Sequence, residues 1–150
     1  MQLNVAPAAI EGVVIGEHGD SEVVAFSNVR IGGLPLASFA AGKALDLAHV
    51  AEDVRNAAYQ IIGGKGHTSF GVATAIVRIC EAVIRDERAV LPVSTFLSGE
   101  FGISELYLSL PCILGGSGIE RILMPDLNEA EVAALQRSAA TVRAALQNLG

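Results

Sequence analysis

The sequence predicts an α+β domain in which antiparallel strands pack against long helices. Three observations lead to this prediction. Short apolar, β-branched segments lie near the start of the chain, two adjacent helical patterns fill its middle, and strand patterns followed by one amphipathic helix fill its end. This order lacks the regular strand and helix alternation that a parallel sheet requires. With 51% hydrophobic composition, residues 1–150 are expected to form one domain with a substantial core.

The first predicted elements are two short strands around a polar loop. Residues 12–15 and 22–26 are apolar and β-branched, which is typical of strands. Between them the sequence GEHGDS places His18 on a loop. From 28 to 47 the pattern is irregular, with glycines and a proline as breakers.

Two consecutive helices are predicted next. One helix covers residues 49–62, and its apolar face is formed by Val54, Ala57, Ala58, Ile61 and Ile62. The glycine-rich segment 63–66 is expected to end it, because glycine adopts the left-handed cap conformation without penalty. Residues 69–87 repeat apolar side chains at helical spacing, so a second helix follows, with Thr68 as its default N-cap.

The C-terminal part is predicted to contain two antiparallel strands and a helix. Residues 89–97 form a strand pattern in which Pro92 marks an edge or a bulge. In 105–110 leucines alternate with polar or amphipathic residues, which indicates a half-buried strand. The last helix is predicted at 128–148, where an asparagine N-cap is followed three residues later by a glutamate.

Composition and charge exclude several function classes. The net charge is −6 and no block of consecutive Lys or Arg occurs, so nucleic acid is not an expected partner. The N-terminus lacks the basic and apolar regions of a signal peptide, and no segment is long enough to cross a bilayer. A soluble, cytoplasmic protein with no membrane partner is therefore expected. Cys80 and Cys112 lack zinc or redox spacing and are interpreted as buried free thiols.

His18 is the first candidate for chemistry. An imidazole has an ordinary pKa of about 6.5, so it can accept or donate a proton near neutral pH, and the flanking glycines permit close approach of a ligand. A catalytic histidine also needs an orienting acceptor, and neither Glu17 nor Asp20 is well placed to provide it. The spacing alone therefore leaves two interpretations open, a general acid or base and a solvated surface histidine.

Two glycine-rich segments and the remaining histidines form no recognisable site. GGKG at 63–66 lacks the framing of a P-loop, and GGSG at 115–118 is not a dinucleotide-binding turn, so a helix cap and an ordinary turn are predicted. His49 and His67 have no partner at metal-ligand spacing and are expected at the surface. No metal site is predicted.

Four motifs occur in order along nearly the whole chain. They are VIGEHGDSEV at 14–23, AAYQII with KGHT within 57–68, VLPVS at 90–94, and LSLP with ILG within 108–115. Together they resemble the C-terminal half of the L-lactate/malate dehydrogenase family, and within that family they are most similar to the bacterial L-lactate dehydrogenases.

The resemblance implies an NAD-dependent oxidoreductase that interconverts pyruvate and L-lactate by hydride transfer. His18 matches the family's proton donor and acceptor, Thr68 its substrate-contacting threonine, and Val72 an apolar position lining the nicotinamide. The implied partners are a small 2-hydroxy or 2-oxo acid and further copies of the chain in a dimer or tetramer. A malate dehydrogenase of the lactate-like type is the alternative within the family, and a non-catalytic oligomerising domain is the alternative outside the enzymes.

Parts of the family pattern are not found in this sequence. In the family, a Rossmann domain, a polarising arginine, a carboxylate-binding arginine and the aspartate that orients the histidine precede these motifs. Residues 1–150 are therefore expected to be the C-terminal catalytic domain, a partial half that binds NAD poorly and turns over little by itself. The residues that select lactate over malate, and NAD over NADP, belong to the missing half. Glu11 replaces the histidine of sugar-bisphosphate-activated members, so no activation by that anion is expected.

Overall fold

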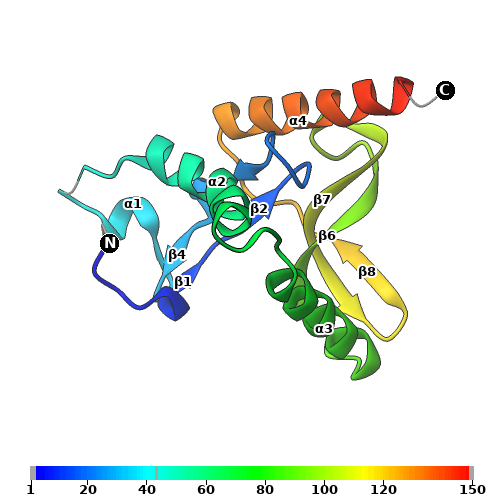
Figure 1. Ribbon diagram of the computed structural model, residues 1–150, viewed down its shortest axis with the longest axis horizontal. Coiled ribbons are helices and arrows are strands. Elements are labelled where there is room, and N and C mark those ends of the chain that lie inside the picture. The colour runs from blue at the N-terminus through cyan, green and yellow to red at the C-terminus, as the bar shows by residue number, and fades with distance from the viewer. Residues whose placement is uncertain (1–2, 43, 149–150) are drawn as a thin grey trace.

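The computed structural model describes residues 3–42 and 44–148 (Figure 1). Its strands are β1 (Ile10–Glu11), β2 (Val14–Ile15), β3 (Val23–Val24), β4 (Arg30–Ile31), β5 (Leu34–Pro35), β6 (Ala89–Ser98), β7 (Ser104–Gly115) and β8 (Gly118–Ile122). Its helices are α1 (Leu36–Phe39), α2 (Leu47–Lys65), α3 (Phe70–Ile84) and α4 (Glu129–Gln147), with short 3-10 turns η1 (Pro7–Ala9), η2 (Phe26–Asn28) and η3 (Glu100–Gly102).

The predicted α+β class is confirmed by the strand pairing. Every strand pair in the described residues is antiparallel, in the orders β1-β4-β5, β2-β3 and β6-β7-β8. In Figure 1 the sheet β6-β7-β8 and the region of β1, β4 and α1 lie on opposite sides, and α4 runs along the top. The small pair β2-β3 lies between them, in contact with β7 and α4.

Strands β6 and β7 of the largest sheet were predicted from the sequence, whereas its third strand, β8, was not. Pro92 lies in β6, the edge strand of its sheet, as predicted, because an edge position leaves its missing N–H without a cost to the ladder. The glycine-rich segment 115–118 is the predicted turn, and it joins β7 to β8. The sequence analysis missed β8, which is short and carries charged residues at its centre.

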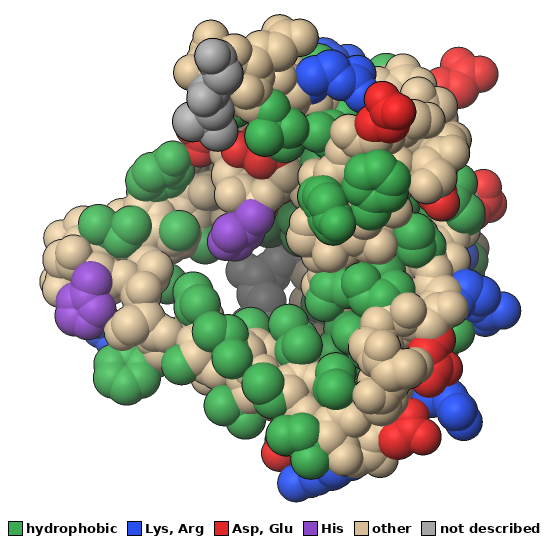
Figure 2. Space-filling view, turned by 90° about the vertical axis from the view of Figure 1, so that its right-hand side faces the viewer, with side chains coloured by type: hydrophobic (Ala, Val, Ile, Leu, Met, Phe, Trp, Pro, Cys, Tyr) green, Lys and Arg blue, Asp and Glu red, His purple; other side chains and the backbone are tan. Residues whose placement is uncertain are grey.

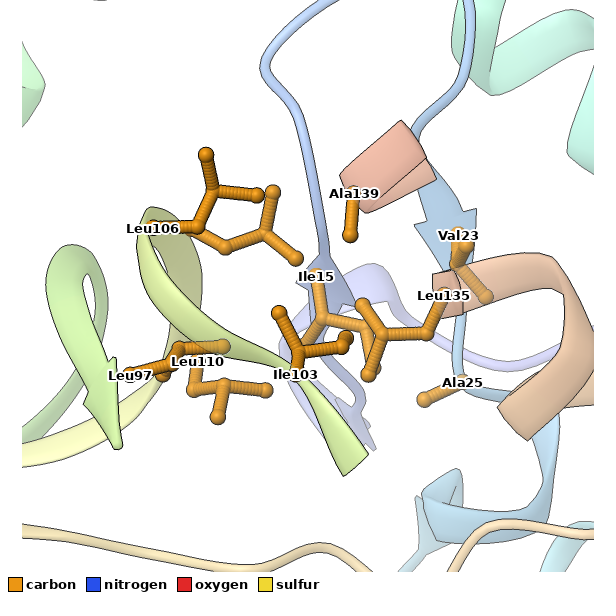
Figure 3. Packing of buried hydrophobic residues seen from close by; sticks show 10 residues of the cluster. Ile15, Val23, Ala25, Leu97, Ile103, Leu106, Leu110, Leu135 and Ala139 are labelled. Carbon is orange, nitrogen blue, oxygen red and sulfur yellow. The ribbon is translucent and has the colours of Figure 1, made fainter. Parts of the chain in front are cut away.

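One hydrophobic core joins β2, β3, β7 and α4 (Figure 3). On α4, Leu135 and Ala139 lie one helical turn apart and both face this core. Its largest fully buried aliphatic side chains are Ile15, Leu97, Leu106, Leu108, Leu110 and Leu135. The alternation of leucines that predicted a half-buried strand therefore places one side of β7 against α4 and β2.

The start of α4 agrees with the prediction. The Asn128 side chain accepts a hydrogen bond from the Glu131 N–H at 2.9 Å, and Glu131 accepts one from the Asn128 N–H at 3.1 Å. This reciprocal pair satisfies two backbone donors that no helical carbonyl can reach. The other oxygen of the Glu131 carboxylate accepts the Ser27 N–H at 3.0 Å, which ties the helix start to the chain after β3.

The two central helices differ from the prediction at their ends and in their burial. Helix α2 continues through the glycines of segment 63–66 and ends at Gly66, which has a left-handed φ of +79°. The N-cap position of α3 is Ser69 rather than Thr68, and α3 ends at Ile84 rather than at 87. The expected apolar face of α2 covers no core, because the helix packs only lightly against β3 and buries no residue.

Three further predictions are resolved by burial and secondary structure. Cys112 is buried, and burial raises the pKa of its thiol, whereas Cys80 on α3 is exposed and was wrongly predicted as buried. His49 and His67 are exposed, as predicted. The irregular stretch 28–47 contains β4, β5 and α1, which are too short to show a periodic pattern. Among the described residues, no helix combines the length and apolar character needed to cross a bilayer.

Candidate active-site loop around His18

The loop that carries His18 connects β2 to β3. These two strands pair antiparallel, with Val14 opposite Val24 and Ile15 opposite Val23, so the chain must reverse within 16–22. The Glu22 N–H closes the reversal by donating to the Gly19 carbonyl at 3.1 Å. His18 is exposed on this loop, while the strand residue before the loop, Ile15, is buried in the core. The local sequence thus places an accessible imidazole on a loop whose preceding strand is fixed in the core.

Gly16 attaches the start of the loop to the large sheet. Its N–H donates to the Ser109 carbonyl at 2.9 Å, and the Ser109 N–H donates back to Gly16 at 3.0 Å. Gly16 has a φ of +94°, which L side chains rarely adopt, and a Cβ there would lie 2.7 Å from Ser138 Oγ. Both the backbone conformation and the close approach of α4 therefore require glycine at this position.

Ser138 attaches the loop to α4. Its side chain is fully buried, and its Oγ accepts the Glu17 N–H at 2.8 Å. The Ser21 hydroxyl lies within hydrogen-bonding distance of the same Oγ, at 3.2 Å, and also donates to the Glu17 carboxylate. The Ser21 N–H donates to that carboxylate as well, at 3.2 Å. The residues on both sides of His18 are therefore bonded to each other and to one buried hydroxyl.

Tyr59 attaches the far side of the loop to α2. Its hydroxyl donates to Asp20 Oδ1 at 2.8 Å. This hydrogen bond and the negative charge of Asp20 both favour the protonated phenol, so they raise the pKa of Tyr59. Asp20 bonds to Tyr59 and Glu17 bonds to Ser21, which agrees with the expectation that neither carboxylate serves to orient His18.

Glu22 is the one buried side-chain acceptor of the described residues without a partner. Its Oε1 is inaccessible to solvent and has no hydrogen-bond donor. Burial raises the pKa of Glu22, and the negative charges of Asp20 and Glu17 raise it further, while the positive charges of His18 and Arg55 oppose the rise. A charged Glu22 therefore carries a desolvation cost beside the His18 loop.

A cavity of about 400 Å³ opens beside His18 between α3, the large sheet and α4. Apolar side chains form much of its wall, and two serine hydroxyls add polar groups. It is lined by Gly16, Glu17, His18, Ile79, Pro92, Val93, Ser94, Tyr107, Leu108, Ser109 and Val142. Figure 2 shows one face of the molecule hollowed, with hydrophobic side chains gathered around the hollow. The size of the cavity suits a small organic acid or a single ring rather than a whole dinucleotide.

Thr68 and Val72 lie apart from this cavity. Thr68 is half-buried in the connection between α2 and α3, and Val72 is exposed in the first turn of α3. Neither residue lines the cavity next to His18. The hydrogen bond from Tyr59 to Asp20 links the His18 loop to α2, and among the described residues no hydrogen bond joins His18 to Thr68. Within the described ranges, no three His, Cys, Asp or Glu side chains converge as a metal site would require.

Ser138 and Tyr59, which hold this loop, were not predicted from the sequence. Ser138 could have been noticed, because it is a serine between Leu135 and Ala139 on the apolar face of α4. Tyr59 offered no such signal, since it belongs to an apolar helical pattern and its partner lies 39 residues away.

Comparison with known proteins identifies the family. A model of the lactate/malate dehydrogenase alpha/beta C-terminal domain matches residues 1–149. This chain belongs to the lactate/malate dehydrogenase family. L-lactate dehydrogenase of Limosilactobacillus fermentum is 44% identical over 148 residues, covering 97% of this chain and 47% of that protein. L-lactate dehydrogenase of Thermus aquaticus is 45% identical over 153 residues, covering 99% of this chain and 49% of that protein.

Solved structures of the family share the fold. The minor L-lactate dehydrogenase from Enterococcus mundtii in its ligands-bound form matches with a TM-score of 0.92 at 35% identity, over 99% of this chain and 48% of that one. A lactate dehydrogenase from a deep-sea metagenome library matches with a TM-score of 0.91 at 34% identity, over 97% and 48%. The chain thus spans about half the length of the lactate dehydrogenases it matches, and its 150 residues include no Rossmann domain. The recognised family and its C-terminal fold are confirmed.

Proposed function

We propose that this chain is the catalytic half of an NAD-dependent L-lactate dehydrogenase, which interconverts pyruvate and L-lactate. The observation that carries the proposal is the GEHGDSE loop, which presents an exposed histidine from a fixed backbone within a domain whose relatives are L-lactate dehydrogenases. The loop geometry favours the general acid or base over the solvated surface histidine, because a purely solvated loop needs no buried attachment.

Each residue of the proposed site has a distinct role. His18 gives a proton to the carbonyl oxygen of pyruvate during reduction and removes it from the hydroxyl of lactate during oxidation. The family resemblance assigns substrate contact to Thr68, between α2 and α3, and nicotinamide contact to Val72, in the first turn of α3, although both lie outside the cavity beside His18. Bound NADH supplies the hydride that this reaction needs.

The described residues fit the reacting end of NAD and not its phosphates. The wall beside His18 is apolar with serine hydroxyls, which suits a ring and a small acid. The glycine-rich segments offer no phosphate cradle, since 63–66 closes α2 and 115–118 forms the turn between β7 and β8. The dinucleotide therefore depends mainly on the half of the enzyme that this chain does not contain.

Activity is best tested with a hybrid enzyme. The part of the Thermus aquaticus enzyme that precedes its matched region would be joined to residues 1–150. We expect the hybrid to oxidise NADH with pyruvate, and His18→Asn to lower the rate by about 10²-fold or more, the usual contribution of a general acid. His67→Asn removes another exposed histidine and serves as the matched control. An undiminished rate in the His18→Asn hybrid would contradict the proposed role.

The chain by itself is expected to be nearly inactive. It lacks the arginines that clamp the substrate carboxylate and polarise its carbonyl in the family, so the transition state loses its main electrostatic support. NADH absorbance with pyruvate, and then with oxaloacetate, should not change above the blank. Turnover by the isolated chain would show that residues 1–150 are more than a partial half. The relatives from Limosilactobacillus fermentum, Pediococcus pentosaceus and Thermus aquaticus are L-lactate dehydrogenases, which favours lactate over malate as the substrate.

The exposed apolar surface of α2 and α3 supports a role in assembly. The exposed large apolar side chains of these helices are Tyr59, Ile61, Ile62, Phe70, Val72, Ile76, Val77 and Ile84. Soluble monomers seldom expose so much contiguous apolar surface, so these helices fit against the other half of the enzyme or further copies in a cytoplasmic homo-oligomer. Sedimentation of the chain at micromolar concentration tests this proposal, and a strict monomer would argue against self-association.

A further inference from the structure

We infer that Ser138 of α4 is a positioning residue that fixes the backbone on both sides of His18. The inference rests on the proposed function, because it assumes that the direction of the His18 imidazole matters for proton transfer. Ser138 lies far from the loop in sequence, at separations of 121 residues from Glu17 and 117 from Ser21. It is exposed to no solvent and touches no reacting group, so it acts only through the loop.

The burial of the Ser138 hydroxyl costs free energy unless hydrogen bonds compensate for the lost water. Its neighbours on the same face, Leu135 and Ala139, belong to the hydrophobic core, where an alanine would pack without burying a hydroxyl. A buried hydroxyl needs hydrogen-bond partners, and those recorded for Ser138 come from the His18 loop. The serine therefore serves the loop rather than the packing of the helix.

The positions of the two partners explain the effect on His18. Glu17 directly precedes His18, and its N–H is held by Ser138 Oγ at 2.8 Å. Ser21 follows three residues later, and its hydroxyl reaches the same oxygen at 3.2 Å. The segment from Glu17 to Ser21 is short, and both of its ends are bonded to the same oxygen atom of Ser138. Rotation of the backbone at His18 would therefore break at least one of these bonds. The backbone at His18 sets the direction of its Cα–Cβ bond, from which the exposed imidazole extends.

The bonds from Ser21 to the Glu17 carboxylate join the two sides of the loop to each other but not to the rest of the fold, so Ser138 supplies the attachment to α4. The two backbone hydrogen bonds between Gly16 and Ser109 fix the chain before the loop but not the peptide that carries His18. The bond from Tyr59 to Asp20 lies at the exposed side, where water competes with it. Among the described contacts, the Glu17 N–H has only a side-chain acceptor, so removal of that acceptor leaves the donor unpaired.

The test uses amide hydrogen exchange of the 150-residue chain measured by NMR. In the native chain we expect the Glu17 amide to exchange slowly, although no backbone carbonyl accepts it. Ser138→Ala should accelerate Glu17 exchange by at least tenfold, while the Gly16 amide, bonded to Ser109, remains protected. Thr141→Ala removes an exposed hydroxyl one turn along α4, which bonds to the Arg137 carbonyl, and is the matched control.

A second readout separates positioning from support of the helix. In the hybrid enzyme, Ser138→Ala should lower kcat for pyruvate about tenfold with little change in the KM for NADH. The three-bond coupling between HN and Hα of His18 should indicate one backbone φ in the native chain and an average over several in Ser138→Ala. Equal kcat in Ser138→Ala and Thr141→Ala would overturn the inference.

Failure of the inference can be distinguished from failure of the proposed function. If the native hybrid does not reduce pyruvate, the proposed function fails, and the exchange of the Glu17 amide still reports on Ser138. If Ser138→Ala does not fold, the native chain alone decides, because a Glu17 amide that exchanges as fast as those of exposed loops would refute the attachment.

Discussion

Replacement of Gly16 by alanine tests the geometry of the His18 loop most directly. The φ of +94° is strained for any L side chain, and the added Cβ would lie 2.7 Å from Ser138 Oγ and 3.3 Å from its Cβ. The left-handed conformation costs about 1–2 kcal/mol. Insertion of a methyl group into a packed interior adds about 1–3 kcal/mol. Gly16→Ala should therefore lower the free energy of unfolding by about 2–5 kcal/mol.

The assay is equilibrium unfolding in urea, with thermal unfolding as a second measure. For a chain of this size, about 2–4 °C of melting temperature are lost per kcal/mol, so a decrease of roughly 4–20 °C is expected. Gly32→Ala is the matched control, because Gly32 also has a positive φ, of +56°, but a Cβ there meets nothing within 4 Å. The loss of stability in Gly32→Ala should therefore reflect only the cost of the left-handed backbone conformation.

A double substitution isolates the close approach. Removal of the Ser138 hydroxyl takes away the nearest atom, so Gly16→Ala should cost less in a Ser138→Ala background than in the native chain. Equal losses for Gly16→Ala and Gly32→Ala would refute the reasoning, since the steric contribution would then be absent.

Three further predictions concern charge and capping. Glu22→Gln should stabilise the chain at pH 7 by up to about 1 kcal/mol, because it removes a charge from a carboxylate whose buried oxygen has no hydrogen-bond partner. The pKa of Glu22 is raised in the folded chain, so the native protein loses stability as the pH rises from the unfolded pKa through the folded pKa. Urea titrations below the unfolded pKa should therefore show no gain from the substitution. Asp20→Asn should lower the pKa of Tyr59 toward its ordinary value of about 10, as seen in the alkaline absorbance change of the tyrosines, and an unmoved transition would contradict the bond between them. Asn128→Ala should lower the free energy of unfolding by about 1 kcal/mol through loss of the cap, whereas an unchanged urea midpoint would argue that the capping box is not formed in solution.

Those parts of the fold that depend on local pattern could be predicted from the sequence. The last helix was predicted with its cap because Asn128 and Glu131 are only three residues apart, and both are needed for one local motif. The position of His18 on a loop followed from two apolar segments that flank it. The strand β8 was missed because its central residues, Glu120 and Arg121, obscure any alternation of apolar side chains.

The remaining features of the fold and of the candidate site depend on which surfaces pack together, and the periodicity of the sequence does not contain that information. The apolar pattern of α2 correctly indicated a helix, but it could not show that this face is left uncovered by the remainder of the chain. The exposure of Cys80 follows from the same cause on α3. For the candidate site, the sequence indicated His18 and the resemblance added Thr68 and Val72, whereas Ser138 required knowledge that α4 crosses the His18 loop.

The attachment of the loop to α4 also has a consequence for biosynthesis. The polypeptide emerges from the ribosome in sequence order, so His18 is synthesised well over a hundred residues before the hydroxyl that fixes its backbone. Contacts of such long range form slowly, because the intervening chain must lose its freedom first. Until the last helix has been made and has docked, a nascent chain carries His18 on a loop that lacks its attachment to α4. The role proposed for His18 would therefore depend on a contact that forms only after the last helix is made.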